Sequence, residues 1–565
     1  MRAVNPLSLA PDFSLRNLSS SEIHAVLKTV DRLLNKKEML AMCVYGSQVA
    51  GYAGKDSDYD VILVLKPFAQ RIKYYYLKGE VDCSALVVDI KAIENDCKKS
   101  TFGEFVSGRL LNSYTSIYGQ SFLKECEVAY KRRVILEGLS DAVVDYMQFA
   151  CEINFPLKYF LFEKLKKRAA IYPPVVYSYS KTYGDDLLES NLEAAMDGFR
   201  RAAVELQQAG IVSFDEKSDI LHIVPWKKGF HAGVSGRIEA AASYTSKSLR
   251  QYAVHGYAGR VGPNVVGREV LSKISRSRTS RKLPDKIKFP RNEWTISEGK
   301  LFVVSKDWLK DLIVYLGMRK DACEVKKNSL GEIYTTAGFY TLLDSASGRE
   351  ISIAVKRFKD IRGMKWGVLN LWSLKNTDFT ANSVERMYRE FRASRELRRF
   401  GLATPEVLAV FFPQKLMVTR FIPGNNLSKI EASYLDEKSD DLSPVFAFGK
   451  DLAIMHNNGY CMGDTKPSNM IFSEEVSRIY FTDLEQSHPD GNKTWDLAEF
   501  IYYSVRFTLR EDRARKLVAS FVQGYQSRSE DSKALDEAAD LRYRAPFQPF
   551  IAPNVLNALR SDLKK

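Results

Sequence analysis

Asp58 and Asp60 stand two residues apart at the start of the apolar run VILVL, a spacing that suggests metal chemistry. Side chains at i and i+2 of a β-strand point to the same face, about 6 to 7 Å apart, so the two carboxylates can share divalent metal ions. Upstream, MLAMCVY predicts a buried strand that ends at Gly46 and Ser47. A glycine lets backbone N–H groups approach a phosphate closely, and the serine hydroxyl adds a donor. The stretch therefore predicts a phosphate-binding turn beside a metal-binding carboxylate pair.

A Gly-Ser pair followed by Asp-x-Asp resembles the minimal nucleotidyltransferases of the DNA polymerase beta superfamily, over residues 20 to 125. The resemblance implies that Mg²⁺ or Mn²⁺ ions held by three carboxylates align an acceptor hydroxyl with the α-phosphate of a nucleoside triphosphate. The next strand offers Asp82 and Asp89, whose separation places them on opposite faces. Asp82 is preferred because its EVD context is similar to that of RNA-end-adding relatives, and Asp89 is the alternative. The implied catalytic and metal-binding residues are Asp58, Asp60 and Asp82, and the implied nucleotide-binding residues are Gly46 and Ser47.

A second chemically suggestive group begins at Lys356, in the polar position of the strand-like segment ISIAVKRF. This placement resembles the VAIK strand of the protein kinase superfamily, which implies that the lysine holds nucleotide phosphates and that an acid orients it. SVERMYREFRASRELRRF predicts a helix ended by Gly401 and Pro405. Within this helix Glu390 is the preferred ion-pair partner, with Glu396 as the alternative. Lys356 and Glu390 are therefore predicted to lie together at a nucleotide.

The segment GDTKPSN places Asp464 five residues before Asn469, with Lys466 between them. Fourteen residues beyond Asn469, IYFTDLEQS presents Asp483 at the end of an apolar strand. This order, together with the upstream AVK segment, resembles the protein kinase superfamily. The resemblance implies that Asp464 orients the substrate hydroxyl and Lys466 faces the γ-phosphate of ATP. It also implies that Asn469 and Asp483 bind Mg²⁺, while Asp496 braces the catalytic loop from a following helix.

Several features differ from those of regulated protein kinases and indicate which kinases the segment resembles most. The glycine-rich loop is degenerate, because SLGEIYTTAGFY contains Gly331 and Gly338 but no GxGxxG. DLE replaces DFG, and the catalytic aspartate is not preceded by the arginine that reads a phosphorylated activation loop. Thirteen residues separate Asp483 from Asp496, too few for the usual peptide-docking platform. These features are similar to the RIO kinases and to the small kinase of the KEOPS tRNA-modification complex, although small-molecule kinases share the same loop.

The stretch between the two groups predicts mainly helices, near residues 135 to 240. ESNLEAAMDGFRRAAVELQQAG has an apolar face at helical spacing, and IVSFDEKSDILHIV alternates around a turn as a hairpin does. A helix followed by a hairpin favours a winged-helix unit, which would use Arg200 and Arg201 against nucleic acid or serve as a packing adaptor. The nearby segment KRAAIYPPVVYSYSKTY has two interpretations. Its tyrosines could stack on a nucleotide base or on RNA beside the transferase site, or they could be core residues that follow a helix ended by proline. Its residues of interest are Tyr172, Tyr177, Tyr179 and Lys181.

Composition describes an ordinary globular protein with a basic balance. The chain has 565 residues, 45% hydrophobic and 27% charged, with a formal net charge of +14 that favours polyanionic partners. Residues 268 to 291 hold nine lysines and arginines against two acids, which predicts either a solvated linker or a segment that attracts phosphate backbones. Neither a membrane-spanning run nor a secretory signal is apparent, and the seven cysteines show no metal-ligand spacing. A cytoplasmic location without membrane association is expected.

The expected fold is multidomain, mixing α/β and α+β. It comprises a nucleotidyltransferase domain with a mixed sheet and helices (1–130), a helical or winged-helix connector with the basic linker (131–300), and a bilobal kinase-like domain (301–565). The expected function is a bifunctional phosphotransferase that uses ATP or another NTP with Mg²⁺ or Mn²⁺, acting as a nucleotidyltransferase and as an atypical Ser/Thr-type protein kinase. The acceptor would be RNA, such as a tRNA-like molecule, or a protein. The alternatives are a single active site with the other fold as a nucleotide-binding regulator, and a non-catalytic RNA-binding assembly scaffold.

Overall fold

The computed structural model divides the chain into two compact units, Met1–Trp294 and Thr295–Lys565. The basic segment 268–291 and Gly331 lie outside the described residues, so the interpretations given to them stay predictions. The structure describes residues 18–34, 38–184, 186–224, 293–296, 300–303, 307–319, 321–328, 337–360, 380, 382–530 and 533–563.

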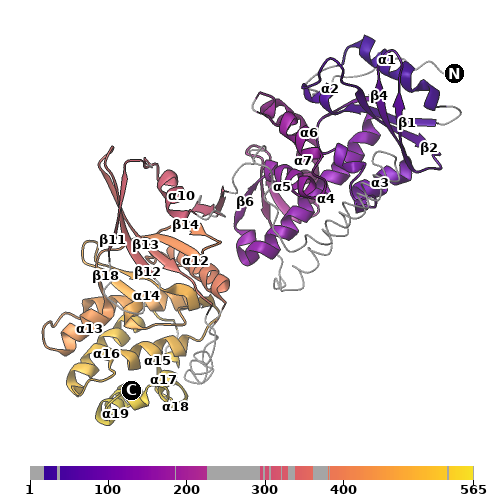
Figure 1. Ribbon diagram of the computed structural model, residues 1–565. Helices are drawn as coiled ribbons and strands as arrows, with labels where there is room; N and C mark the ends of the chain where they lie inside the picture. Colours follow the sequence, from indigo (N-terminus) through magenta and orange to yellow (C-terminus); the bar gives the residue numbers. More distant parts are fainter. Residues whose placement is uncertain are drawn as a thin grey trace, which may run out of the picture. The chain divides into compact units, whose positions relative to one another are not determined.

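A five-stranded sheet forms the core of the first half of unit 1 (Figure 1). Its strand order is β3-β4-β2-β1-β5, with β2 and β4 parallel and the other neighbours antiparallel. Val61 and Leu63 of β2 pack with Val26 and Val30 of α1. Because side chains alternate along a strand, Asp60 faces the other side of the sheet. The bounds are α1 Ser20–Val30, β1 Glu38–Tyr45, α2 Ser47–Ala50, β2 Tyr59–Lys66, β3 Ile72–Leu77, β4 Cys83–Asp89, α3 Ile90–Lys99 and β5 Tyr114–Tyr118.

One long helix, α4, joins this sheet to the rest of unit 1, and it runs through residue 130, where the sequence predicts a domain boundary. Lys131 of α4 is fully buried, and its Nζ lies 2.6 Å from Glu127 and donates to the carbonyl of Ala195 on α7 at 2.7 Å. A buried ammonium group needs such partners, and these contacts fasten α4 to α7. The sheet and the helical segment after it belong to one compact unit, and the predicted boundary at residue 130 stays a prediction. The further bounds are α4 Gln120–Tyr146, β6 Ile153–Pro156, α5 Leu157–Ile171, α6 Val175–Thr182, α7 Leu188–Gln208, β7 Val212–Asp215 and β8 Ile220–Ile223.

The predicted hairpin after α7 is present, with β7 antiparallel to β8 and β6 on the other edge of β8. Arg200 of α7 donates to Asp219 in the hairpin turn at 2.8 Å and to Glu193 at 2.6 Å. Arg201 forms an ion pair with Asp197. Carboxylates compensate both guanidinium charges, so this geometry does not favour the two arginines as phosphate contacts. The winged-helix assignment itself stays a prediction.

Unit 2 begins with a sheet in the order β11-β12-β13-β15-β14-β10, in which β10 and β14 run parallel and the other neighbours antiparallel. Ile353 and Val355 of β13 are buried on one face, which directs Lys356 to the opposite face. The helix α12 begins at Asn382, whose side chain accepts backbone N–H groups of the first turn. The bounds are β10 Lys300–Val303, α10 Trp308–Tyr315, β11 Cys323–Asn328, β12 Ala337–Asp344, β13 Arg349–Arg357, α12 Ser383–Arg399, β14 Val407–Phe411 and β15 Leu416–Arg420.

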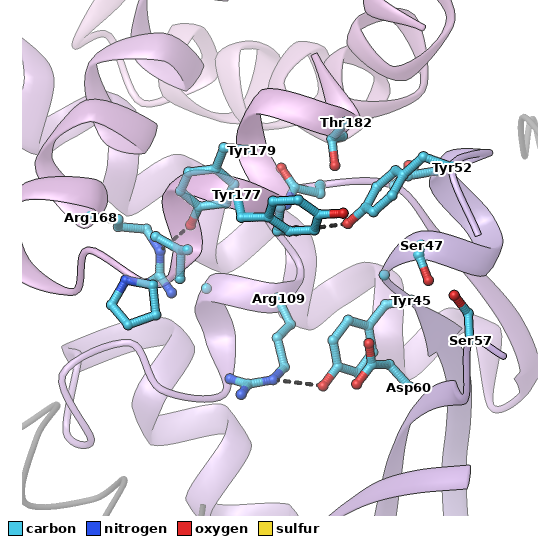
Figure 2. Close-up of a pocket in the computed structure, with 18 of the residues that line it drawn as sticks. Tyr45, Ser47, Tyr52, Ser57, Asp60, Arg109, Arg168, Tyr177, Tyr179 and Thr182 are labelled. Atoms are coloured by element: carbon cyan, nitrogen blue, oxygen red, sulfur yellow. Dashed lines mark hydrogen bonds between the residues drawn. The ribbon is translucent and has the colours of Figure 1, made fainter. Parts of the chain in front are cut away.

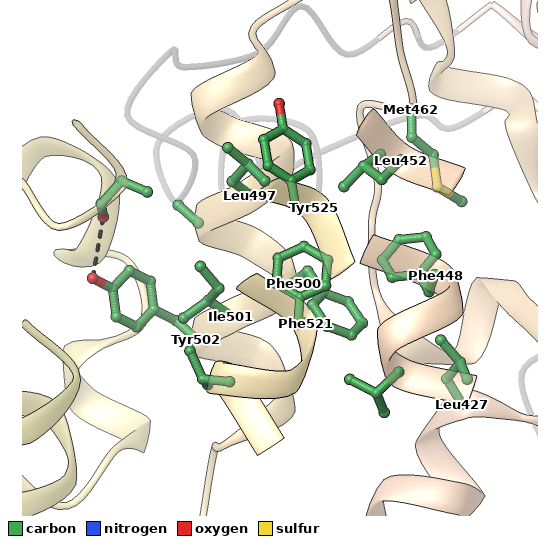
Figure 3. Packing of buried hydrophobic residues seen from close by; sticks show 14 of the residues in the cluster. Leu427, Phe448, Leu452, Met462, Leu497, Phe500, Ile501, Tyr502, Phe521 and Tyr525 are labelled. Carbon is green, nitrogen blue, oxygen red and sulfur yellow. Dashed lines mark hydrogen bonds between the residues drawn. The ribbon is translucent and has the colours of Figure 1, made fainter. Parts of the chain in front are cut away.

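The rest of unit 2 is mainly helical and surrounds an aromatic-rich core (Figure 3). Phe448, Phe500 and Phe521 meet there with ring centroids 4.4 to 5.8 Å apart. The helices α14 and α16 approach so closely that a Cβ on Gly449 would collide with the backbone of Phe521. The bounds are β16 Asn425–Asn426, α13 Leu427–Leu435, α14 Ser443–Asn457, β17 Tyr460–Cys461, β18 Met470–Ser473, β19 Arg478–Phe481, β20 His488–Pro489, α15 Lys493–Ser504, α16 Glu511–Gln526, α17 Lys533–Ala538, α18 Leu541–Arg544 and α19 Pro553–Leu563.

The chain is thus a mixed α/β protein with several sheets and helices, which confirms the broad class expected from the sequence. Within the described ranges, no helix combines the length and the apolar character needed to cross a membrane. The nucleotidyltransferase and kinase fold names rest on the motif resemblances and are taken up again below.

Candidate functional sites

The turn at Gly46 and Ser47 lies directly against Asp60. In the pairing of β1 with β2, Tyr45 stands opposite Asp60, which brings the turn that follows β1 to this carboxylate. Gly46 has a φ of +80°, and a Cβ built on it would lie 2.5 Å from Asp60 Oδ2. Both the backbone conformation and the available space therefore favour glycine at this position. The phosphate-binding turn and one of the metal-binding carboxylates predicted from the sequence are neighbours.

Asp82 lies beside Asp58 at the same end of the sheet. The parallel register of β2 and β4 pairs Tyr59 with Cys83, and the N–H of Tyr59 donates to the carbonyl of Asp82 at 2.8 Å. Burial, followed by the charges of Asp58 and Asp82, raises the pKa of the Cys83 thiol to about 11, so both carboxylates act on one atom. Ser84, the β4 residue opposite Asp60, donates its hydroxyl to Asp58.

Asp89, the alternative third carboxylate, lies at the far end of β4. Its side chain caps α3 by accepting the N–H of Lys91 at 2.9 Å, and it also accepts the N–H of Phe68 at 3.3 Å. These contacts use Asp89 to cap a helix and hold a turn. Its position therefore favours Asp82 over Asp89 as the candidate third carboxylate. Two triads in the described part of the chain place His, Cys or carboxylate ligand atoms within 4.8 Å of one another, and Asp58, Asp60 and Asp82 are not one of them. Asp58 and Asp82 precede the paired residues Tyr59 and Cys83, and Asp60 follows Tyr59, so the three aspartates lie at the same end of two neighbouring strands.

A cavity of about 550 Å³ opens at this edge, between the sheet and the helices α5 and α6 (Figure 2). Tyr179, one of the tyrosines in question, is buried and accepts a hydrogen bond from Arg168 Nε at 2.9 Å, so it has a packing role. Tyr177 is 68% exposed and lines the cavity. The core interpretation therefore fits Tyr179, and the base-stacking interpretation of Tyr177 stays a prediction. The predicted residues that line the cavity are Gly46, Ser47, Asp60, Tyr172, Tyr177 and Tyr179.

Arg109 also lines the cavity and was not identified from the sequence. Its Nε donates to the hydroxyl of Tyr45 at 2.9 Å, and a terminal nitrogen donates to the hydroxyl of Tyr74. The loop that carries it is fixed by Asp96, which accepts four backbone N–H groups between residues 102 and 107 at 2.9 to 3.1 Å. No motif surrounds Arg109, so its position depends on contacts that the local sequence does not reveal.

In unit 2, Lys356 lies among three carboxylates. Its Nζ is 2.6 Å from Glu390 on α12 and 3.1 Å from Glu485, and it also forms an ion pair with Asp483. The predicted contact between Lys356 and Glu390 is present. Glu396, the alternative, pairs with arginines of its own helix.

Glu485 is a site residue that the sequence analysis passed over. It is the third residue of DLE, where the DFG motif has glycine. Arg386, one turn before Glu390 on α12, pairs with Glu485 at 2.5 Å. Two features of the sequence could have indicated Glu485: an acid stands where the DFG motif has glycine, and Arg386 lies one helical turn before Glu390.

The loop between β17 and β18 carries the predicted catalytic residues. Lys466 Nζ lies 2.6 Å from Asp464 Oδ1, and the amide nitrogen of Asn469 donates to the carbonyl of Asp464 at 3.0 Å. The N–H of Thr482 donates to the carbonyl of Asn469 at 2.8 Å, which ties this loop to the end of the strand before Asp483.

Two acids of α15 hold the same loop from behind. Asp496 accepts the N–H groups of Met462 at 2.7 Å and Gly463 at 2.8 Å, so the predicted bracing contact is present. Glu499, one turn later, accepts the N–H of Thr465 at 2.8 Å and was not identified from the sequence. A second acid three residues after the bracing aspartate, on the same helix face, was its signal.

The carboxylates around Lys356 carry an excess of negative charge. Burial raises the pKa of Glu390 to about 7, against the opposing effect of Lys356. Burial also disfavours ionisation of Asp483, but Lys356 and then Lys466 outweigh it and lower the pKa of this carboxyl. Ligand atoms of Glu390, Asp483 and Glu485 lie within 4.8 Å of one another. Lys356 forms ion pairs with all three carboxylates. The oxygens of Asp483 and of the amide of Asn469 are of the kind that Mg²⁺ prefers.

Comparison with known proteins bears on the C-terminal part. No family model matches the chain. The KEOPS complex subunit Bud32 of Pyrococcus abyssi (strain GE5 / Orsay) is 31% identical to it over 101 residues, which are 18% of this chain and 44% of that protein. The chain thus spans less than half the length of this curated relative. The similarity supports the kinase-like resemblance of the C-terminal part and does not bear on the nucleotidyltransferase resemblance.

Proposed function

We propose that unit 2 is an atypical protein-kinase-like phosphotransferase that moves the γ-phosphoryl group of ATP to a hydroxyl acceptor. The observation that carries this proposal is the contact of Lys356 with both Glu390 and Asp483. In kinases the strand lysine, the helix acid and the metal-binding aspartate must be in place together. The similarity to Bud32 over 101 residues supports the same proposal.

Each residue has a role in this reaction. Lys356, oriented by Glu390, binds the α- and β-phosphates. Asp464 orients the acceptor hydroxyl and takes its proton as oxygen bonds to the γ-phosphorus and ADP leaves, while Lys466 faces the transferred group. Asn469 and Asp483 would hold Mg²⁺ through an amide oxygen and a carboxylate, and the ion would neutralise phosphate charge.

A second activity, nucleotidyl transfer, is proposed for unit 1 on a separate observation, the contact of the Gly46 turn with Asp60 at the edge of a cavity. The turn of Gly46 and Ser47 would hold the phosphates of a nucleoside triphosphate. Asp58, Asp60 and Asp82 offer carboxylates for Mg²⁺ or Mn²⁺, which would activate the acceptor hydroxyl and stabilise the pyrophosphate that leaves. This proposal rests on the geometry of the described residues and on the motif resemblance.

The acceptor of either site is proposed to be RNA, tRNA-like molecules included, or a protein. If only one site is catalytic, the other would act as a nucleotide-binding regulator. If neither is, the chain would be an RNA-binding assembly scaffold.

The test follows two labels through one protein. The full-length chain is incubated with α-labelled or γ-labelled ATP, Mg²⁺, RNA and protein acceptors. We expect Asp60→Asn to abolish α-label transfer only, and Asp464→Asn to abolish γ-label transfer only. Asp56→Asn and Asp436→Asn, at exposed positions of the same units, serve as matched controls. Transfer of either label that survives its own variant contradicts the assignment of that site, and salt-sensitive RNA binding without transfer favours the scaffold.

A further inference from the structure

Arg109 carries a charge that no acid of the described chain compensates. Its hydrogen bonds go to the hydroxyls of Tyr45 and Tyr74, which are neutral groups. Its guanidinium also lies over three aromatic rings, with centroids at 4.6 Å for Phe105, 5.6 Å for Tyr74 and 5.7 Å for Tyr45. Other enclosed cations of unit 1 differ in this respect: Lys131, for example, pairs with Glu127.

An enclosed cation without an anion is costly to maintain, because desolvation disfavours the charge. Burial indeed opposes ionisation of Arg109, but the two tyrosines outweigh burial and keep its pKa above the usual value. The guanidinium therefore stays charged, and its two hydrogen-bond partners are tyrosine hydroxyls, with no carboxylate among them. Such an arrangement suits a ligand that brings its own negative charge, and phosphate matches the planar donor geometry of arginine.

The cavity around Arg109 has a volume suited to such a ligand and an exposed aromatic ring, that of Tyr177, at its border. Its volume of about 550 Å³ falls within the range of about 300 to 1,000 Å³ of small-molecule sites. Figure 2 shows Arg109 and Tyr177 bordering the same hollow, with Ser47 and Asp60 along it. The ring of Tyr177 is exposed, and no other described ring or cation stacks on it. A free aromatic face accepts any nucleobase.

We propose that this cavity binds a nucleotide, with a phosphate on Arg109 and the base against Tyr177. Arg109 is then a substrate-binding residue, and Tyr177 sets the position of the base. This proposal names the substrate-binding residues of the proposed nucleotidyl transfer. Only the reaction of the bound nucleotide rests on that proposed function, because binding can be measured without transfer.

The test measures binding to the full-length chain carrying Lys356→Met, which removes the phosphate contact of unit 2. The probes are ATP, AMP, adenosine and inorganic tripolyphosphate, and the binding of each is measured by titration calorimetry. We expect Arg109→Met to weaken ATP, AMP and tripolyphosphate binding by about tenfold or more and to leave adenosine unchanged. Tyr177→Ala should weaken ATP and adenosine and spare tripolyphosphate. Arg201→Met, which removes one surface charge from the same unit, should change nothing.

The outcomes separate this inference from the proposed activity. Unchanged ATP and tripolyphosphate binding in Arg109→Met, or no nucleotide binding to the parent, overturns the inference. Binding that depends on Arg109 in a protein that transfers no α-label supports the inference and counts against the transferase. If Arg109→Met does not fold, Arg109→Lys and the exposed Tyr177→Ala replace it, and unchanged binding in both overturns the proposal. A 5′-phosphorylated dinucleotide is tested in the same way. If it binds more tightly than ATP and Arg109→Met weakens its binding, the phosphate on Arg109 comes from an RNA end and not from a free nucleotide.

Discussion

The two candidate sites differ in how they hold their charged groups. In unit 2, Lys356 lies within ion-pair distance of Glu390, Glu485 and Asp483, and the catalytic loop is tied to Asp496. In unit 1, two arginines line the cavity: Arg168 pairs with Glu104, whereas Arg109 donates to the hydroxyls of Tyr45 and Tyr74. In the first site the cation is paired with carboxylates, whereas in the second Arg109 is hydrogen-bonded to hydroxyls, which is the basis for the ligand proposed above.

This difference has a functional consequence. A lysine fixed by several acids is pre-organised, so its removal should affect transfer of the phosphoryl group strongly. A guanidinium held by tyrosines contributes mainly when an anion arrives, so its removal should affect binding first. The following changes test the contrast, from the largest expected effect to the smallest.

Lys356→Met should lower γ-label transfer by at least about 10³-fold, because the lysine contacts both Glu390 and Asp483, the aspartate proposed to hold the metal. Initial rates of γ-label and α-label transfer measure the effect, and the α-label rate should not change. Lys429→Met, at an exposed position of the same unit, is the matched control. An equal loss in both variants would contradict the special role of Lys356.

Asp496→Ala should lower the free energy of unfolding of unit 2 by about 2 to 5 kcal/mol, because it leaves the buried N–H groups of Met462 and Gly463 without their acceptor. Urea denaturation followed by tryptophan fluorescence measures the change. Asp436→Ala removes an exposed carboxylate and should cost far less. Equal stability of the two variants would show that the bracing contact is dispensable.

The pH dependence of stability should differ between the units. Burial raises the pKa of Glu431 to about 8, so the stability from its protonated form is full below its usual pKa of 4.5 and is lost as pH rises through about 8. In unit 1, burial opposes ionisation of Glu127, but Lys131 and Lys124 outweigh it and lower its pKa, so its contribution is lost on acidification. Calorimetry should show the unit 2 transition weakening between about pH 5 and pH 9, by on the order of a few kcal/mol. Glu431→Gln should remove the part of that dependence that comes from Glu431, because burial also raises the pKa of Glu390 to about 7 in the same unit. A dependence unchanged by Glu431→Gln would contradict the assignment to Glu431.

Gly46→Ala should have the smallest effect on stability, about 1 to 2 kcal/mol from the positive φ. It should nevertheless impair α-label transfer, because the added methyl group meets Asp60 Oδ2. Gly210→Ala has a similar φ of +70° and open space around the new methyl group, so it isolates backbone strain. Equal α-label transfer in the two variants would argue against a functional contact between Gly46 and Asp60.

Much of both candidate sites could be predicted from local sequence. The strand before Gly46, the hairpin after α7, and the position of Lys356 on the polar face of a strand all follow from periodicity over a few residues. The bracing role of Asp496 follows from motif order. Residues close in the chain obey the geometry of one helix, strand or turn, so their spacing carries enough information.

Sequence by itself determined which residue types stand in which order, and the tertiary structure decided which of them meet. Lys356 and Asp483 pair although 127 positions separate them, and Lys131 of α4 donates to the carbonyl of Ala195 on α7, 64 positions away. Asp89 turned out to cap a helix, while Arg109, which no motif marks, came to line the cavity. The physical reason is that strand register and helix packing depend on the burial of the whole core, and residue spacing along the chain does not encode them.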